Sequence, residues 1–274
     1  MKNGNIIYPS PPLSQYVKYY WVVKTNSTVS NAIQTIPSGC IHLVFHRGND
    51  LYFSTGDKQP KNFIRGQLSF PGTLSFSGNI DMIAIIFYPL GLIPFLKLPS
   101  SEVYNQYLDI DTIRDTGLNE LKTRISNEEN TTECIRLIEH FLLNRIRNAN
   151  DYNYNRISDS IQSIKEQTSI TVSGLADKAC LGYRHFKRVF TKYTGMSPKE
   201  FIKVIRFQRT LHSLQNMPAI DMAQLAYSSG FYDQPHLVKD FKSMSGCTPT
   251  EYVSSRKPHS TFFSNECRIN LINY

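Results

Sequence analysis

The sequence predicts an α+β protein in which a β-rich N-terminal part precedes an all-α C-terminal part. Three observations support this prediction. Aromatic and β-branched runs separated by turn residues fill most of residues 1–130. Beyond them, hydrophobic residues recur at helical spacing. In addition, the stretch HLVKDFKSMSGCTPTEY at 236–252 repeats the pattern of HFKRVFTKYTGMSPKEF at 185–201, so one helical unit occurs twice.

The N-terminal part is predicted to form a small β-barrel or sandwich over residues 1–130. Its strongest strand candidates are three aromatic and β-branched runs, Tyr19–Thr25, Cys40–His46 and Met82–Tyr88. Turn-forming pairs such as Pro71-Gly72 and Gly78-Asn79 lie between them. Short strands with frequent turns are typical of barrels and sandwiches.

Composition and cysteine usage predict a cytoplasmic protein. The chain has 274 residues, of which 41% are hydrophobic, and this is enough for two domains with their own cores. Its five cysteines lack the close spacing of a zinc or redox motif, so we expect reduced thiols. The N-terminus lacks the apolar core of a signal peptide. The most apolar run, Met82–Leu96, is broken by prolines and a glycine and is too short to span a membrane.

A linker helix followed by a polar linker is predicted next. The segment TTECIRLIEHFLLNRIRN contains no glycine or proline, and Ile135, Ile138, Leu142 and Ile146 fall near helical spacing. The polar stretch NANDYNYNR then indicates a linker, after which the helical pattern resumes. The sequence therefore divides into residues 1–130, 131–156, 157–258 and a C-terminal tail, 259–274.

The duplicated unit has the layout of a helix-turn-helix. In the first copy, Phe186, Val189, Phe190 and Tyr193 share one helix face, and basic residues lie away from it. A short helix around Leu175 and a turn precede this helix, an arrangement whose second helix enters the major groove of DNA. The second copy has a turn one residue longer. Its apolar face consists of Leu237, Phe241 and Met244.

Both copies end in the same pattern, Gly-x-Ser/Thr-Pro-x-Glu, at 195–200 and 246–251. The glycine is expected to end the preceding helix in a left-handed conformation. The Ser/Thr and Glu predict a capping box that starts the next helix, with proline at its first position. The helix that begins after Ser197 is apolar over a wide arc, so we expect it to lie between the two copies and to fix their distance.

Positive charge is concentrated in the helical part of the chain. The formal net charge is +8. Residues 1–150 carry 14 Lys/Arg against 12 Asp/Glu, whereas residues 151–258 carry 15 against 9. Between Lys178 and Arg209 there are nine basic residues and one acidic residue. Such a concentration favours a polyanionic partner, although a solvated helix face would give the same composition.

Residues 157–252 resemble the DNA-binding domain of the AraC/XylS family of bacterial transcription regulators. The matching stretches are LADKACLGYRHFKRVFTKYTGMSPKEFIKVIRFQRTLHSL and LAYSSGFYDQPHLVKDFKSMSGCTPTEY. The resemblance implies two helix-turn-helices joined by one long helix, each placing a recognition helix into successive major-groove segments. It further implies double-stranded DNA and RNA polymerase as partners, and transcription regulation as an activator or a repressor.

The resemblance also assigns DNA-contacting residues by position. Arginine and lysine suit the acceptors of guanine, and glutamine suits adenine. The expected base-facing residues are Arg184, Lys187 and Arg188 in the first copy and Gln234, His236 and Lys239 in the second. Phosphate contacts are expected from Lys192 and Lys242. Pro235 departs from the family pattern, which puts a hydroxyl contact at that position in doubt.

The N-terminal part carries a second, less specific resemblance. PPLSQYVKYYW, IPSGCIHLVFH and FIRGQ are similar to the cupin-like sensor half of a subgroup of these regulators. This implies a cavity for a small-molecule effector whose identity the sequence does not give. In such regulators a helix after the barrel often mediates dimerisation. The apolar stripe on residues 131–148 is therefore interpreted as a homodimer seam, with packing against the barrel as the close alternative.

Several histidines and one arginine invite sharper interpretations. His42 and His46 alternate along one strand and share a face, so they could bind a metal or a small molecule, although a structural or surface role is favoured. Arg65 could bind an acid group, but a surface role is favoured. His185 and His236 recur at matched positions without a cysteine or carboxylate to complete a metal site. No metal, cofactor or catalytic residue is therefore expected.

The sequence thus predicts a DNA-binding transcription regulator that is not an enzyme. No nucleophile–base arrangement, phosphate-binding loop or dinucleotide fingerprint is visible. Two alternatives stay open. One is a cupin-type metal enzyme with an appended DNA-binding domain. The other is a regulator whose N-terminal part responds to protein contact, without a small-molecule effector.

Overall fold

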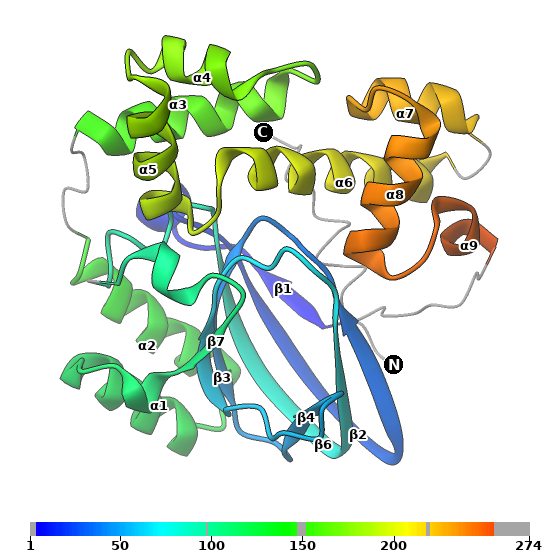
Figure 1. The fold of residues 1–274 in the computed structure, drawn as a ribbon. Helices are drawn as coiled ribbons and strands as arrows, with labels where there is room; N and C mark the ends of the chain where they lie inside the picture. Colours follow the sequence, from blue (N-terminus) through cyan, green and yellow to red (C-terminus); the bar gives the residue numbers. More distant parts are fainter. Residues whose placement is uncertain (1–3, 97, 147–151, 218–219, 255–274) are drawn as a thin grey trace.

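A computed structural model describes residues 4–96, 98–146, 152–217 and 220–254 (Figure 1). An antiparallel sheet is followed by a wholly helical part, which confirms the predicted α+β class. In Figure 1 the sheet occupies the lower half, and the helices of the C-terminal part lie above it. Within the described residues, no helix has the length and apolar character needed to cross a bilayer.

The sheet is built around one long antiparallel pair of strands, β2 and β6, which are far apart in sequence. Its order is β1-β2-β6-β3-β5-β7, with β4 also paired to β6. Strands β2 and β6 span 19 and 16 residues, well beyond the shorter runs expected from sequence, and Trp21 pairs with Ala84 in their register. Closure into a cupin-like barrel stays a prediction. The strands are β1 (Asn5–Ile7), β2 (Val17–Thr35), β3 (Ile41–His46), β4 (Leu51–Phe53), β5 (Asn62–Arg65), β6 (Gly72–Phe87) and β7 (Tyr107–Asp109).

Both faces of the sheet are buried. Along β2, Tyr20 and Val22 belong to a core cluster that includes α1 (Thr116–Asn127) and α2 (Thr131–Leu143). The alternate residues of β2, such as Trp21, belong to a second cluster that continues into the C-terminal helices. Because both faces are covered at the centre of the sheet, β3 and the end of β6 are buried at consecutive residues instead of alternating. The sheet therefore joins the two halves of the molecule.

The apolar stripe of α2 is not a dimer seam. Its residues Ile135, Ile138 and Leu142 are at most 9% exposed and pack within the chain's own N-terminal core. Helix α2 contacts α1 and the short 3-10 helix η1 (Pro11–Leu13). The interpretation as a seam was therefore wrong, and the alternative of packing against the sheet is correct. The same burial pattern explains why the stripe is wide, since a helix on a sheet buries a broader face than a coiled-coil seam.

The C-terminal part consists of two helix-turn-helix units joined by α6. Helices α4 and α5 form the first unit and α7 and α8 the second, while α3 packs on α5 and α6. The polar stretch predicted as a linker is helical from Tyr152 onward, because α3 begins there. The helices are α3 (Tyr152–Glu166), α4 (Val172–Lys178), α5 (Tyr183–Thr194), α6 (Pro198–Asn216), α7 (Met222–Ser229), α8 (Gln234–Ser245) and α9 (Pro249–Ser254). The predicted tail, 259–274, lies outside the described residues.

The two turns close alike and differ by one residue. In the first unit Leu181 N donates to Ala176 O over 3.0 Å, and in the second Phe231 N donates to Ala226 O over 2.9 Å. After these matched bonds, the second turn contains one additional residue before its recognition helix. That residue is Tyr232, which is 93% exposed. The extra length is thus accommodated on the surface, without disturbing the packing of either unit.

Candidate nucleic-acid interface

The first recognition helix, α5, separates apolar and basic residues onto opposite faces. Phe186 and Phe190 are fully buried, and Val189 and Tyr193 are at most 8% exposed. Its sequence, YRHFKRVFTKYT, contains no acidic residue. The four predicted DNA-contacting residues are all exposed: Arg184, Lys187, Arg188 and Lys192. The exposed face of this helix is therefore basic and carries no acidic residue.

The second recognition helix, α8, presents a more mixed surface. Its apolar residues Leu237 and Phe241 are fully buried, as expected. The predicted contact residues Gln234, Lys239 and Lys242 are exposed. The helix begins with Asp233, whose side chain accepts from the backbone N of His236 over 2.8 Å and caps the helix. Pro235 lies within the first turn, where its missing N–H costs little.

His236 differs from the other seven predicted contact residues because it is engaged inside the domain. It is half-buried, and its Nε2 lies 3.2 Å from the Oδ2 of Asp240 one turn later. Its ring stands edge-on to Phe231, with the ring centroids 5.3 Å apart. From the sequence, His236 is expected to face bases, whereas in the structure its ring packs against Phe231 of the turn.

Asp240 is a buried carboxylate of α8 that pairs with basic groups on the side of the helix facing the protein interior. It is 5% exposed, and Lys203 of α6 lies 3.2 Å from its Oδ1. With His236 on its other oxygen, this carboxylate is directed at the protein interior and at α6. Its charge therefore subtracts little from the exposed Lys239 and Lys242, and the outer face of α8 remains basic.

The connecting helix α6 is held on both sides. The Arg209 guanidinium donates to Ile164 O and Lys165 O at the C-terminal end of α3, over 2.7 and 2.8 Å. Lys203 reaches the second unit through Asp240. Cations at a helix C-terminus satisfy its free carbonyls and oppose its dipole. The helix thus ties both units together by polar contacts in addition to its wide apolar face.

Both predicted capping boxes are confirmed. In the first copy Glu200 N donates to Ser197 Oγ over 3.3 Å, and Ser197 N donates to a carboxylate oxygen of Glu200. In the second copy Glu251 N donates to Thr248 Oγ1 over 3.2 Å, and Thr248 N donates to Glu251 over 2.7 Å. These hydrogen bonds from Thr248 lower the pKa of Glu251. The glycines that precede both boxes are left-handed, as predicted.

Three exposed tyrosines near this surface were not among the predicted contacts. Tyr183, at the start of α5, is 51% exposed, and Lys187 lies 5.7 Å from its ring centroid. Tyr227 of α7 and Tyr232 of the second turn are more than four-fifths exposed. Aromatic residues beside a basic helix can contact bases or sugars. The sequence signal was the position of Tyr183 at a helix start and of Tyr232 in a turn, whereas Tyr227 lies within α7 and carried no such signal.

The histidines of the sheet are buried. His42 and His46 are each 3% exposed, and the Arg65 guanidinium donates to the His42 ring over 2.8 Å. Arg65 is itself 5% exposed, so the surface role favoured for it was wrong. Burial, with Arg65 and Lys18 adding to it, holds the pKa of His42 well below its usual value. In the part of the chain that the structure describes, no group of three or more His, Cys, Asp or Glu side chains is placed to hold a metal ion.

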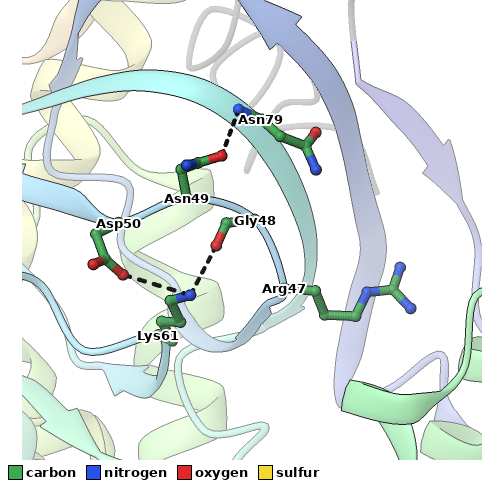
Figure 2. Close-up of a pocket in the computed structure, with 6 residues that line it drawn as sticks. All are labelled: Arg47, Gly48, Asn49, Asp50, Lys61 and Asn79. Atoms are coloured by element: carbon green, nitrogen blue, oxygen red, sulfur yellow. Dashed lines mark hydrogen bonds and ion pairs between the residues drawn. The ribbon is translucent and has the colours of Figure 1, made fainter.

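A polar hollow of about 290 Å³ lies at the turn between β3 and β4 (Figure 2). Its charged residues are paired with protein groups: Lys61 Nζ lies 2.9 Å from Gly48 O and 3.5 Å from Asp50. The guanidinium of Arg47 points away from the hollow in Figure 2 and reaches Asp81 at 2.8 Å. Residues of both signs meet here, so the lining indicates no particular class of ligand. The lining residues are Arg47, Gly48, Asn49, Asp50, Lys61 and Asn79.

Two family models match this chain. Residues 5–109 match a domain of unknown function (DUF6597), and residues 175–255 match a helix-turn-helix domain. The second match covers α4 through α9, the elements that carry both recognition helices. The first covers the sheet, to which that model assigns no activity.

Curated relatives are also regulators. The Msm operon regulatory protein of Streptococcus mutans is 27% identical over 155 residues, which are 56% of this chain and 55% of that protein. The HTH-type transcriptional regulator ArgR of Pseudomonas aeruginosa is 23% identical over 137 residues, 45% of this chain and 41% of that protein. The chain thus spans about half the length, or less, of these relatives.

Solved structures similar to the chain include ToxT from Vibrio cholerae O395. That structure has a TM-score of 0.45 and 14% sequence identity, and the match covers 89% of this chain and 99% of ToxT. The helix-turn-helix match, the regulators among the relatives and the two capped, basic recognition helices agree with one another. These findings support the resemblance of residues 157–252 to the DNA-binding domain of AraC/XylS-family transcription regulators.

Proposed function

We propose that this protein binds specific DNA sequences through both helix-turn-helix units and regulates transcription at those sites. The observation that carries the proposal is the pair of recognition helices, α5 and α8, each buried on one face and exposed with basic or amide side chains on the other. Two such helices joined by a single connecting helix suit successive major-groove segments, about 34 Å apart on one face of the duplex.

We assign roles within this surface by chemistry. Arg184, Lys187 and Arg188 are proposed to read bases in one half-site, with arginine bonded to guanine. Gln234 and Lys239 are proposed to read the other half-site. Lys192 and Lys242 lie in the last turn of their helices and are proposed to contact phosphates. His236 is left out of direct readout because it packs against Phe231 and Asp240.

The test is selection of bound duplexes from random DNA with the purified chain. We expect one preferred sequence with two half-sites separated by about one helical turn, and affinity that falls steeply with rising salt. A chain with Arg184, Lys187 and Arg188 all replaced by Ala should lose the preference in one half-site. Enrichment of no sequence at any salt concentration would refute the proposal.

The roles of the rest of the chain are proposals of the same kind. The N-terminal part is proposed to sense an effector or a protein partner, and RNA polymerase is a proposed partner at the promoter. A homodimer is also proposed, but its contact must use a surface other than the buried stripe of α2. The proposed division of the chain remains residues 1–130, 131–156, 157–258 and 259–274. A cytoplasmic location is also proposed, because the proposed DNA target of a bacterial regulator lies in the cytoplasm.

A further inference from the structure

The two recognition helices end in the same side-chain motif, which extends the duplication beyond the capping boxes. Thr194 Oγ1 donates to Phe190 O over 2.8 Å and accepts from Met196 N. Ser245 Oγ likewise donates to Phe241 O over 2.8 Å and accepts from Cys247 N. Thr194 and Ser245 are the last residues of α5 and α8. Because the last carbonyls of a helix have no N–H donor within that helix, the main-chain carbonyls of these two residues need another donor.

A glutamine of the sheet domain donates to each of these two carbonyls. Gln67, which follows β5 and is 1% exposed, donates from Nε2 to Thr194 O over 2.8 Å. Gln34, on β2, donates from Nε2 to Ser245 O over 2.5 Å. Both contacts satisfy a free carbonyl at the negative end of a helix dipole. The N-terminal sheet therefore holds the C-terminal ends of both recognition helices.

The backbone at each contact is shaped for close approach. A Cβ on Gly195 would lie 2.6 Å from Ser100 O, because α5 packs against the 3-10 helix η2 (Ser100–Val103). A Cβ on Gly246 would lie 3.2 Å from Gln34 Nε2 itself. The absence of a side chain at these left-handed positions lets the sheet domain reach the helix ends.

The connecting helix is held by the same domain. Gln208 of α6 is 7% exposed and donates from Nε2 to Pro37 O over 2.5 Å. Tyr104 donates to Glu200 Oε1 over 2.7 Å in the first turn of that helix. In Figure 1, α6 crosses above the sheet with α5 and α8 at its two ends. The contacts of Gln67 and Gln34 lie at the C-terminal ends of α5 and α8, and the residues proposed to read bases begin at the N-terminal ends of these helices.

From these contacts we propose that the N-terminal sheet acts as a brace that sets the spacing of the two recognition helices, and that Gln34 and Gln67 are its positioning residues. The inference rests on the proposed function as a two-site DNA-binding protein. A brace of this kind leaves the outer faces of α5 and α8 free and restricts how they move relative to each other. The second helix then meets its half-site at a high effective concentration once the first is bound.

The brace predicts a specific loss when its two hydrogen bonds are removed. Gln34→Met and Gln67→Met keep the size of the side chain but remove the amide donor. The double variant should bind a duplex with both half-sites roughly tenfold more weakly, because the effective concentration of the second helix falls. Its affinity for a duplex with one half-site scrambled should stay within about twofold, because each helix still reads its own bases. It should also tolerate one or two inserted base pairs between half-sites better than wild type does.

The experiment uses the full chain and the duplex found by selection. Binding is measured by fluorescence anisotropy on three duplexes: the selected site, the site with one half scrambled, and the site with inserted base pairs. Gln162→Met is the matched control, because Gln162 donates to Glu166 within the exposed side of α3. Circular dichroism and thermal unfolding establish that each variant is folded.

Three outcomes would overturn the brace. Unchanged affinity and spacing preference in the double variant would show that the glutamines do not position the helices. Tighter binding would show that they hold the helices in an unproductive arrangement. An equal loss on the duplex with one half scrambled would place the damage within a helix. Failure of the proposed function looks different, because wild type itself would then show no preferred duplex.

Discussion

At the scale of single residues, the two recognition helices offer different chemistry to DNA. Helix α5 carries two arginines and two lysines on its exposed face, whereas α8 offers one glutamine and two lysines. Arginine binds guanine through two parallel hydrogen bonds, which a lysine cannot reproduce. We therefore expect the first half-site to contribute more of the sequence discrimination than the second.

Arg188→Ala tests this expectation. Removing a guanidinium that reads one base should cost about 1–3 kcal/mol of binding free energy and relax the preference at one position. The measurement is a titration against the selected duplex and the three variants of that base pair. Arg124→Ala, an exposed arginine on α1 in the N-terminal part, is the control and should change affinity little. Equal binding losses at all four base pairs would instead indicate a phosphate contact.

His46 makes the stability of the fold depend on pH. Burial, helped by Lys61 and opposed by Asp81 and Asp50, lowers its pKa to about 4. The folded state therefore keeps a neutral ring, while the unfolded state takes up a proton below its usual pKa of about 6.5. The stability that His46 contributes is complete above about pH 6.5 and is lost as pH falls towards 4, by up to about 1.4 kcal/mol per pH unit.

His46→Gln should therefore flatten the decline of unfolding free energy between about pH 6.5 and 4. His42, whose pKa is also lowered, remains and should preserve part of the slope. Denaturant unfolding at several pH values gives the measurement, and His185→Gln, at an exposed position, is the control. A slope identical to wild type would contradict this, because it would mean that His46 has the same pKa in the folded and unfolded states.

At the scale of helices, the two left-handed glycines that end α5 and α8 differ in how much space surrounds them for a methyl group. Gly195 has φ 88° and Gly246 has φ 79°, so alanine at either position incurs the left-handed penalty of about 1–2 kcal/mol. At position 195 a methyl group would also meet the main-chain oxygen of Ser100 at 2.6 Å. At position 246 it would meet only the end of the Gln34 side chain, which can move.

Gly195→Ala should consequently destabilise the chain more than Gly246→Ala does. We expect about 2–4 kcal/mol for the first, because overpacking adds to the backbone penalty, and about 1–2 kcal/mol for the second. Chemical denaturation of the two variants under identical conditions gives both values. Equal costs would show that the close approach of η2 to α5 relaxes easily.

The elements differ in how far sequence alone could predict them. The recognition helices, the caps and the left-handed glycines follow from local spacing and were predicted correctly. The role of α2 and the burial of Arg65 could not be read from their own neighbourhoods, because each is decided by a partner distant in sequence. An amphipathic stripe looks the same whether its partner is a sheet of the same chain or a second subunit.

For the molecule as a whole, charge predicts how DNA binding responds to salt. Each phosphate neutralised by a lysine or arginine releases counterions, so log affinity falls linearly with log salt concentration. Lys192→Ala should weaken binding to all duplexes alike and reduce that slope by about 1, because Lys192 is assigned to phosphate. The slope is obtained from titrations at several salt concentrations. A change of sequence preference in this variant would contradict the assignment.

The contacts between the two halves were also beyond reach of the sequence. Gln34 stands in no distinctive motif, and FIRGQ, which ends in Gln67, gave no sign of the partner of this glutamine. The partners of Gln34 and Gln67 lie 211 and 127 positions away. The acceptors are main-chain carbonyls, which every residue possesses. Pairing of this kind becomes visible only when the sheet and the helices are placed together in space.

This choice of acceptor has an evolutionary consequence. Since the brace grips the backbone of α5 and α8, it makes no demand on the side chains that face DNA. Mutations at Arg184, Lys187 or Gln234 could redirect the protein to new DNA sites, while the hydrogen bonds from the sheet to α5 and α8 stay the same. Recognition and support can then diverge independently, provided that the left-handed caps and the buried contacts with α6 are kept.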